Sequence, residues 1–118
     1  MAKVISDDYP YLPIVFRVRD IEQSALAFID TGFDGYLVIP EELESKLGEE
    51  DYISKWELAD GSFAAGPEYL GKVRIEGLNN SEISARITCI GDEFIVGREI
   101  IDEFQLVFDH GERVKVST

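Results

Sequence analysis

The sequence predicts an all-β fold, and three observations lead to this prediction. Residues 14–18 and 83–89 alternate apolar and polar side chains with the period of two that is typical of a half-buried strand. Turn signals that contain Gly, Asn or Asp separate these and other short apolar segments. Only two short stretches have a helical pattern. We therefore expect a small closed barrel or a sandwich with one or two short helices.

The first half of the chain is expected to form a hairpin, a third strand and a short helix. The helix is indicated by Pro40 at its first position, by acidic residues in its first turn and by Gly48 just past its end. The hairpin joins an alternating strand to a more fully apolar one. In chain order we expect strand 14–18, turn 20–23, strand 24–29, strand 36–39 and helix 41–47.

The second half is expected to contain two hairpins and a second short helix. Asp60-Gly61 is a strong hairpin signal, and we expect Gly66-Pro67 to interrupt the arm that follows it. Cys89 falls on the apolar face of an alternating strand, which predicts a buried thiol. In chain order we expect strand 53–58, a return arm over 63–75, turn 77–80, strand 83–89, strand 94–96, helix 98–103, and strands 106–108 and 114–116 around a turn at 109–111.

Composition limits the classes of function. The 118 residues fit a single domain, 1–118, and 24 Asp and Glu against 11 Lys and Arg give a net charge of −13. Nucleic acids and anionic membrane surfaces bind proteins mainly through Lys and Arg, so neither is an expected partner. No apolar run approaches the roughly 20 residues of a membrane span, and the N-terminus lacks the apolar core of a signal peptide. We therefore expect a cytoplasmic protein.

Most kinds of catalytic or metal site lack the residues that they need. A Ser or Cys nucleophile requires a histidine base, and His110 lies in a turn near the C-terminus. A zinc site requires a cluster of His and Cys. Residues of segment 30–41 match part of the spacing of a calcium loop, but Gly32 stands where that loop needs a side-chain ligand. We expect no metal and no other cofactor.

The segment Phe28-Ile29-Asp30-Thr31-Gly32 places an aspartate directly after an apolar strand, and Asp-Thr-Gly looks like the catalytic triplet of aspartic proteases. Further along, Phe94-Ile95-Val96-Gly97-Arg98 is similar to the apolar segment and Gly-Arg pair that precede a short helix in retroviral-type proteases. The Asp60-Gly61 hairpin lies where that family has its flap. Over roughly residues 12–108 the chain resembles a single-lobe, retropepsin-like aspartic protease. The resemblance implies a small closed barrel of the retropepsin-like acid protease type, with a hairpin flap at about 56–69.

The resemblance also implies a catalytic mechanism. Two carboxylates held close together cannot both ionise easily, so the pair shares a proton. The ionised member takes a proton from water as general base, and the protonated member polarises the peptide carbonyl. Because this chain has a single Asp-Thr-Gly, a catalytic pair requires Asp30 from each subunit of a two-fold homodimer. The implied function is an aspartic endopeptidase that hydrolyses a peptide or protein substrate without a cofactor.

By the same resemblance, each neighbouring residue has an implied role. Thr31 would hydrogen-bond across the two-fold axis, and Gly32 would let the backbone turn close to the substrate. Asp34 would contact the substrate backbone and form an ion pair with Arg98. Gly97 would let the following helix pack against the active-site loop. The implied substrate-binding residues are Phe33, Asp34 and the flap-tip residues Ala59, Asp60, Gly61 and Ser62.

Two departures from the family pattern leave a second function open. Phe33 stands where the family usually has Ala or Ser, which would narrow the cleft, and the flap tip is more polar than in viral enzymes. The alternative is a non-catalytic module that keeps the fold for dimerisation or peptide binding. Trp56 and Phe63 are equally compatible with packing and with substrate contact. The charge of −13 on each subunit predicts tighter dimerisation and higher activity below about pH 6, and a preference for basic or neutral peptides over acidic ones.

Overall fold

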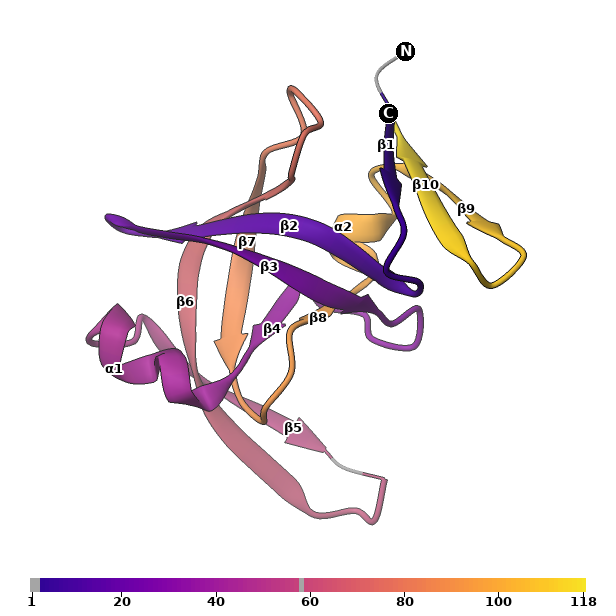
Figure 1. Ribbon diagram of the computed structural model, residues 1–118. Coiled ribbons are helices and arrows are strands. Elements are labelled where there is room, and N and C mark those ends of the chain that lie inside the picture. The colour runs from indigo at the N-terminus through magenta and orange to yellow at the C-terminus, as the bar shows by residue number, and fades with distance from the viewer. Residues whose placement is uncertain (1–2, 58) are drawn as a thin grey trace.

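The computed structural model describes residues 3–57 and 59–118, which form a β-rich fold with short helical segments (Figure 1). The strands are β1 (Lys3–Ser6), β2 (Tyr11–Val18), β3 (Ile21–Ile29), β4 (Leu37–Ile39), β5 (Tyr52–Glu57), β6 (Phe63–Ile75), β7 (Ile83–Cys89), β8 (Ile95–Val96), β9 (Gln105–Asp109) and β10 (Arg113–Ser117). The helical segments are the 3₁₀ turn η1 (Glu41–Leu43), which runs into α1 (Glu44–Leu47), and α2 (Arg98–Ile101). In the described part of the chain, no helix has the length and apolar composition needed to span a membrane.

Six strands close into a barrel. Their order is β2-β3-β8-β4-β7-β6, and β6 returns to pair with β2, where Ile14 lies opposite Ile75. Strand β5 pairs with β6 and extends the sheet beyond the barrel as the β5–β6 hairpin. The predicted all-β class is therefore confirmed, and the closure through β2 and β6 makes the fold a barrel and not a sandwich.

The two ends of the chain form a second, three-stranded antiparallel sheet, which we call the terminal sheet. Its order is β1-β10-β9, so β10 lies between the first strand of the chain and β9. Strand β1 has no counterpart among the strands predicted from the sequence, because four residues are too few to show a clear alternation and its partner lies at the other end of the chain.

The structure corrects two predicted features of the strands. The predicted turn 20–23 is shorter, because β3 already begins at Ile21 and the turn consists of Arg19-Asp20, with a φ of 53° at Arg19. The predicted interruption at Gly66-Pro67 does not occur, since both residues pair with β5 within one continuous strand β6. Leu58, the last residue of a predicted strand, lies outside the described residues.

The barrel encloses the hydrophobic core. The alternation predicted for 83–89 is confirmed as far as Ile87, since Ala85 and Ile87 are buried and Ser84 and Arg86 are exposed. It ends at Thr88, which is buried like its neighbour Cys89. Burial, helped by the charges of two glutamates, raises the pKa of the Cys89 thiol to about 11. The thiol is therefore protonated at neutral pH and packs as a core side chain. The largest fully buried side chains are Tyr69, Phe16, Leu12, Ile14, Leu37, Ile39, Ile75, Ile87 and Ile100.

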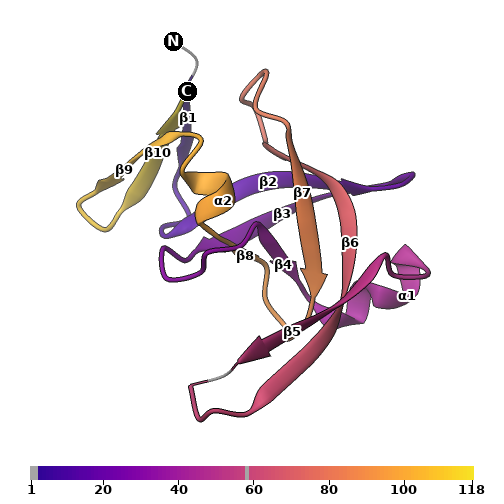
Figure 2. The same cartoon turned by 180° about the vertical axis from the view of Figure 1, so that it is seen from behind.

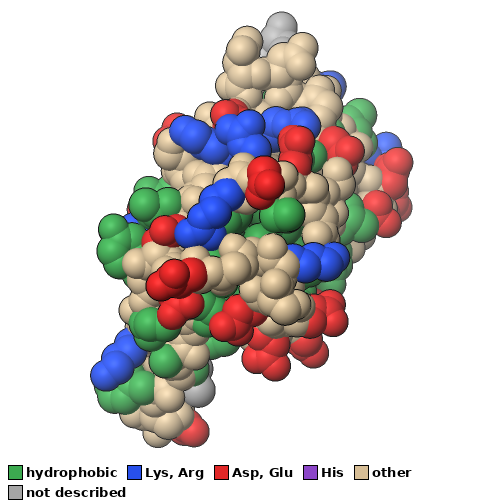
Figure 3. Space-filling view, turned by 90° about the vertical axis from the view of Figure 1, so that its left-hand side faces the viewer, with side chains coloured by type: hydrophobic (Ala, Val, Ile, Leu, Met, Phe, Trp, Pro, Cys, Tyr) green, Lys and Arg blue, Asp and Glu red, His purple; other side chains and the backbone are tan. Residues whose placement is uncertain are grey.

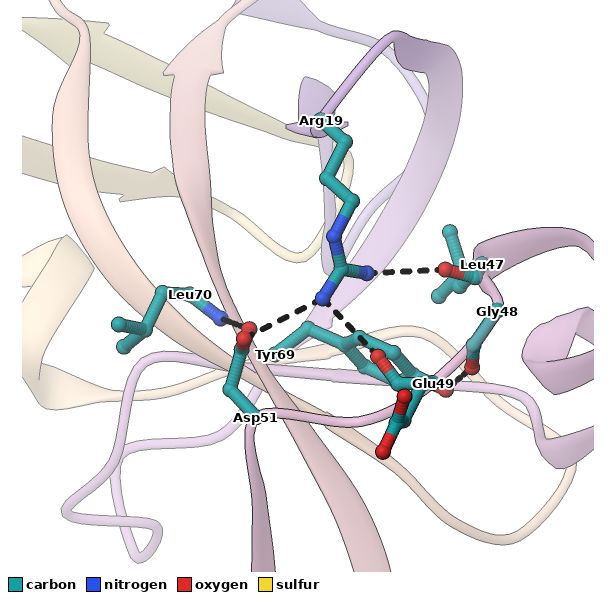
Figure 4. A network of polar contacts seen from close by, with 7 residues as sticks. All are labelled: Arg19, Leu47, Gly48, Glu49, Asp51, Tyr69 and Leu70. Atoms are coloured by element: carbon teal, nitrogen blue, oxygen red, sulfur yellow. Dashed lines mark hydrogen bonds and ion pairs between the residues drawn. The ribbon is translucent and has the colours of Figure 1, made fainter.

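A network of polar contacts fixes the base of the β5–β6 hairpin (Figure 4). The Arg19 guanidinium donates to the carbonyl oxygens of Leu47 (3.0 Å) and Glu49 (2.9 Å). It also forms an ion pair with Asp51 at 3.2 Å, and Asp51 accepts a hydrogen bond from the backbone N–H of Leu70 (2.9 Å). Because Asp51 directly precedes β5 and Leu70 lies in β6, the network ties the start of the hairpin to the barrel and does not reach its tip.

Three parts of the molecule project from one side of the barrel. The β5–β6 hairpin, the loop between β3 and β4, and the β9–β10 hairpin lie toward the right in Figure 1 and toward the left in Figure 2. The opposite side, which β2, β6 and α1 form, faces the viewer in Figure 3, where acidic and basic side chains are interleaved. Two ion pairs of this barrel wall are Arg17–Glu82 at 3.8 Å and Arg74–Glu22 at 3.6 Å.

The terminal sheet carries a charged cluster around Asp109. Its carboxylate lies 2.6 Å from the His110 ring, 3.6 Å from Lys115 and 3.8 Å from Arg113. The hydrogen bond with His110 is the main cause that lowers the pKa of Asp109 from its ordinary value of 3.8. A carboxylate whose pKa is lowered on folding stabilises the fold above its ordinary pKa, and this contribution is lost as the pH falls through the lowered pKa.

We therefore expect Asp109→Asn to destabilise the protein more at pH 7 than at about pH 2, because the stabilisation that the ionised carboxylate gives to wild type is lost in acid. The measurement is the Tm of wild type and variant at both pH values by circular dichroism. Asp20→Asn is a suitable control, because Asp20 is an exposed carboxylate of the β2–β3 turn and belongs to none of the ion pairs of the described residues. An Asp109→Asn effect of the same size at both pH values would contradict this assignment.

Candidate active site

The loop between β3 and β4, residues 30–36, begins with Asp30. Strand β3 runs parallel to β8, with Ile29 opposite Val96. The backbone N–H of Asp30 donates to the carbonyl oxygen of Val96 at 3.0 Å, so the pairing continues one residue past the end of β3. The aspartate is thus placed by the end of a core strand and not by a free loop.

The start of helix α2 and the 30–36 loop hold each other in place. The first amides of a helix have no partner within the helix, and here carbonyl oxygens of the loop accept from them. These contacts are Gly97 N–H to Tyr36 (2.9 Å), Arg98 N–H to Phe33 (2.9 Å) and Glu99 N–H to Gly35 (3.1 Å). The two segments predicted to belong to one site are therefore joined through their backbones.

The carboxylate of Asp30 is half-buried and lines a cavity of about 290 Å³. One of its oxygens accepts a hydrogen bond from the backbone N–H of Gly32 at 2.9 Å, which fixes the orientation of the group. The other residues that line the cavity are mostly apolar: Phe33, Val38, Trp56, Ile90, Gly91, Asp92, Glu93 and Ile95. A carboxylate beside an apolar cavity can act as acid or base on a group bound there.

Thr31 lines a different cavity. Its side chain is exposed, and the cavity, of about 190 Å³, lies between the loop, the end of α2 and strand β9. The residues that line it with Thr31 are Ile101, Asp102, Phe104, Leu106 and Phe108. Asp30 and Thr31 are adjacent in the sequence but line different cavities. The cavity of Asp30 lies beside the β5–β6 hairpin, and the cavity of Thr31 lies beside the terminal sheet.

Gly97 lies at a close approach between the loop and the start of α2. A Cβ atom at this position would lie 2.4 Å from the carbonyl oxygen of Gly35 and 2.5 Å from the ring of Phe33. We expect Gly97→Ala to lower the free energy of unfolding by about 3 kcal/mol, because the backbone of the loop has to shift. Chemical denaturation monitored by circular dichroism measures this loss.

Gly61→Ala provides the control for Gly97→Ala. A Cβ at Gly61 would meet no atom within 4 Å, but the φ of +85° is unfavourable for alanine. This variant should therefore lose only about 1 kcal/mol, from backbone strain alone. Equal losses in the two variants would show that the loop and α2 are not closely packed.

The predicted ion pair between Asp34 and Arg98 is wrong for this chain. Both side chains are exposed, and none of the ion pairs among the described residues joins them. Arg98 contacts the loop through its backbone N–H, which donates to the carbonyl oxygen of Phe33, and both exposed side chains can be solvated by water instead of pairing with each other. Asp34 instead lines a polar cavity beneath the β5–β6 hairpin.

The predicted flap tip is an exposed turn. The Asp60 carboxylate accepts hydrogen bonds from the hydroxyl (2.5 Å) and the backbone N–H (2.9 Å) of Ser62, and these bonds lower the pKa of Asp60. Ala59, Gly61 and the other tip residues are exposed and are not among the residues that line the cavity at Asp30. Trp56, on β5, is the residue of the hairpin that lines this cavity.

The cavity also contains residues that the sequence does not single out. Val38 belongs to the apolar strand that the sequence predicts at 36–39, but no sequence pattern indicates that it lies near Asp30. Asp92 and Glu93 join Asp30 at the cavity because they precede β8, which lies between β3 and β4. Within 3–57 and 59–118, no group of three or more His, Cys, Asp or Glu side chains is placed to hold a metal ion.

Comparisons of the sequence with protein-family models and with curated proteins give no match. Among solved structures, the chain is similar to the crystal structure of a retropepsin-like aspartic protease from Rickettsia conorii, with a TM-score of 0.63 and 16% identity over 98% of each chain. It is also similar to EIAV protease complexed with the inhibitor HBY-793, with a TM-score of 0.51 and 19% identity over 80% of this chain and 86% of that chain. At these identities the likeness shows the fold. The chain has the retropepsin-like fold, which it shares with aspartic proteases, as the resemblance implies.

Proposed function

We propose that this chain is an aspartic endopeptidase that acts as a homodimer, with Asp30 of both subunits in one shared site. The observation that supports this function best is the position of Asp30, which lines an apolar cavity beside the β5–β6 hairpin in a retropepsin-like fold. The predicted triplet Asp30, Thr31 and Gly32 stands at the end of a core strand. The hydrogen bond from the Gly32 N–H holds the Asp30 carboxylate in a fixed orientation.

The proposed reaction needs two carboxylates in different protonation states. When two such groups approach closely, ionisation of one raises the pKa of the other, so the pair holds one shared proton. The ionised Asp30 removes a proton from a water molecule as this water attacks the peptide carbonyl, and the protonated Asp30 of the other subunit donates a hydrogen bond to the carbonyl oxygen. The Asp30 that took the proton from water then delivers it to the amide nitrogen of the tetrahedral intermediate. The C–N bond breaks, and the two products are a carboxylic acid and an amine. No cofactor takes part.

The side of the barrel from which three parts project is the proposed dimer face (Figures 1 and 2). Thr31 and Phe108 line one cavity there, so the active-site loop and β9 form a continuous surface. Tyr9, in the segment after β1, packs against Phe108 and also exposes an apolar side chain there. Segment 105–117 contains two acidic and two basic residues and has no net charge, in a chain whose net charge is −13. Self-repulsion therefore opposes contact at this segment less than the net charge of the whole chain would suggest.

The test of the proposed function is hydrolysis of peptides by the purified protein. A diverse peptide mixture is incubated with the protein between about pH 3 and pH 7, and mass spectrometry identifies the products. We expect cleavage, with higher activity below about pH 6, because acid reduces the repulsion between subunits and favours the shared proton. A peptide whose scissile amide is replaced by a hydroxyethylene group should inhibit the reaction. A dimer that binds peptides but cleaves none would support the alternative, a non-catalytic peptide-binding module.

A further inference from the structure

Two aromatic side chains join the active-site loop to the β5–β6 hairpin. The rings of Phe33, from the loop, and Trp56, from β5, have centroids 5.1 Å apart and planes inclined by 39°. We call this pair the aromatic wall. Aromatic rings at this separation attract each other beyond the effect of the apolar area that they bury. The wall is therefore a real contact between the hairpin and the loop that carries Asp30.

One half of the aromatic wall is rigidly backed. The ring of Phe33 lies against two glycine backbones: a Cβ at Gly35 would be 2.4 Å from this ring, and a Cβ at Gly97 would be 2.5 Å from it. Trp56 is held differently, by the pairing of β5 with β6, opposite Ala64. Phe33 is thus positioned by the loop and the start of α2, whereas Trp56 is positioned by the β5–β6 hairpin.

The aromatic wall separates two cavities of different character, since Phe33 and Trp56 line both. The cavity with Asp30, of about 290 Å³, is lined mainly by apolar side chains. The second cavity, of about 410 Å³, is polar, and we call it the polar pocket. The residues that line it besides the wall are Asp34, Gly35, Tyr36, Ser54, Lys55, Glu68, Arg86, Thr88 and Glu99.

The polar pocket has an excess of negative charge. Glu68 is buried and forms an ion pair with Arg86 at 3.3 Å, so these two charges compensate each other. Asp34, Glu99 and Lys55 belong to none of the ion pairs of the described residues. Two free carboxylates against one free ammonium favour a basic side chain in this pocket.

Two pockets on either side of one wall can each take a side chain from the same face of an extended peptide. Side chains two positions apart point to the same face of a strand and lie about 7 Å apart. A peptide that places one side chain beside Asp30 can therefore place the side chain two positions away in the polar pocket. The Nε1–H of Trp56 is buried and has no acceptor among the described residues. A peptide carbonyl would supply the missing acceptor.

We propose that the aromatic wall sets the peptide specificity of the site, with an apolar side chain beside Asp30 and a basic side chain two positions away in the polar pocket. This inference rests on the proposed function for the binding of peptides, but it does not require hydrolysis. It assigns Phe33 and Trp56 to substrate selection, and it assigns Asp34 and Glu99 to the recognition of the basic side chain.

The chain contains one tryptophan, Trp56, so its fluorescence reports directly on the wall. Binding is measured with the Asp30→Asn variant, which prevents turnover, and with synthetic peptides that carry a central Leu. At each flanking position, a peptide with Lys is compared with one with Glu. We expect Lys to bind about tenfold more tightly than Glu at a position two residues from Leu, with a change in Trp56 emission, and no comparable preference at the adjacent positions.

Two further variants in the Asp30→Asn background make the test specific. Asp34→Asn combined with Glu99→Gln should reduce the Lys-to-Glu ratio to near one and leave the requirement for Leu unchanged. Phe33→Leu removes the ring but keeps an apolar side chain, so it is the variant to use if Phe33→Ala does not fold. It should let bulkier side chains replace the central Leu of the peptide. Equal binding of Lys and Glu peptides, a preference confined to the adjacent positions, or no binding of any peptide would overturn the inference. If wild type cleaves peptides but shows no charge preference, the inference about specificity is wrong and the proposed function stands. If the charge preference is found but wild type cleaves no peptide, the inference stands and the proposed function is wrong.

Discussion

The Asp30→Asn variant should fold and dimerise like wild type and lose peptide hydrolysis by at least about 10³-fold in kcat/KM. Asparagine has almost the same shape as aspartate and can still accept the hydrogen bond from Gly32 N–H that is seen at 2.9 Å. It can neither remove a proton from water nor share one with the other subunit. The loss should therefore appear in kcat and not in the binding of an uncleaved substrate peptide. Asp20→Asn, an exposed carboxylate of the β2–β3 turn, is the matched control and should keep full activity.

A mixing experiment distinguishes a shared site from a site complete in one chain. If wild-type and Asp30→Asn subunits exchange freely in equal amounts, about one quarter of the dimers contain two wild-type subunits. If the site is shared, activity should fall to about one quarter of that of pure wild type at the same total protein concentration, because mixed dimers have only one Asp30 carboxylate. A site within one subunit predicts about one half. Retention of half the activity would therefore reject the proposed mechanism even if Asp30→Asn alone is inactive.

The position of Asp30 was predictable because the pattern that indicates it is local. An apolar strand followed by Asp-Thr-Gly specifies both the secondary structure and the residue at its end, and Gly97-Arg98 opens a helix that the sequence also indicates. The contacts between these segments were only partly predictable. The resemblance implied that Asp34 and Arg98 meet through their side chains, but the contact that forms is between backbones, because the amides at the start of α2 need acceptors and the loop carbonyls supply them.

The aromatic wall and the terminal sheet depend on pairings between distant segments, which periodicity does not reveal. Trp56 reaches Phe33 because β5 is carried by β6 on the outside of the closed barrel. Strand β1 forms because β10, at the other end of the chain, offers it an edge. A sequence pattern can predict each strand by itself, but the register that brings two strands together comes from packing of the whole core.

Phe108→Glu should dissociate the proposed dimer and abolish hydrolysis with it. The Phe108 ring is 46% exposed, packs edge-on against Tyr9 with ring centroids 6.1 Å apart, and shares a cavity with Thr31. In a two-fold dimer the change occurs twice, so two desolvated charges should weaken association on the order of 10³-fold. Leu70→Glu is the matched control, because Leu70 is 50% exposed but lies on β6 in the barrel wall.

Sedimentation and hydrolysis measured on the same samples give the decisive comparison. The Leu70→Glu variant should remain dimeric and active, which shows that an added surface charge is tolerated. The Phe108→Glu variant should sediment as a folded monomer, and raising its concentration should restore dimer and activity in parallel, because each active site is complete only when two Asp30 carboxylates meet. A variant that stays dimeric but inactive would place the interface elsewhere. A monomer with full activity would show that one Asp30 suffices.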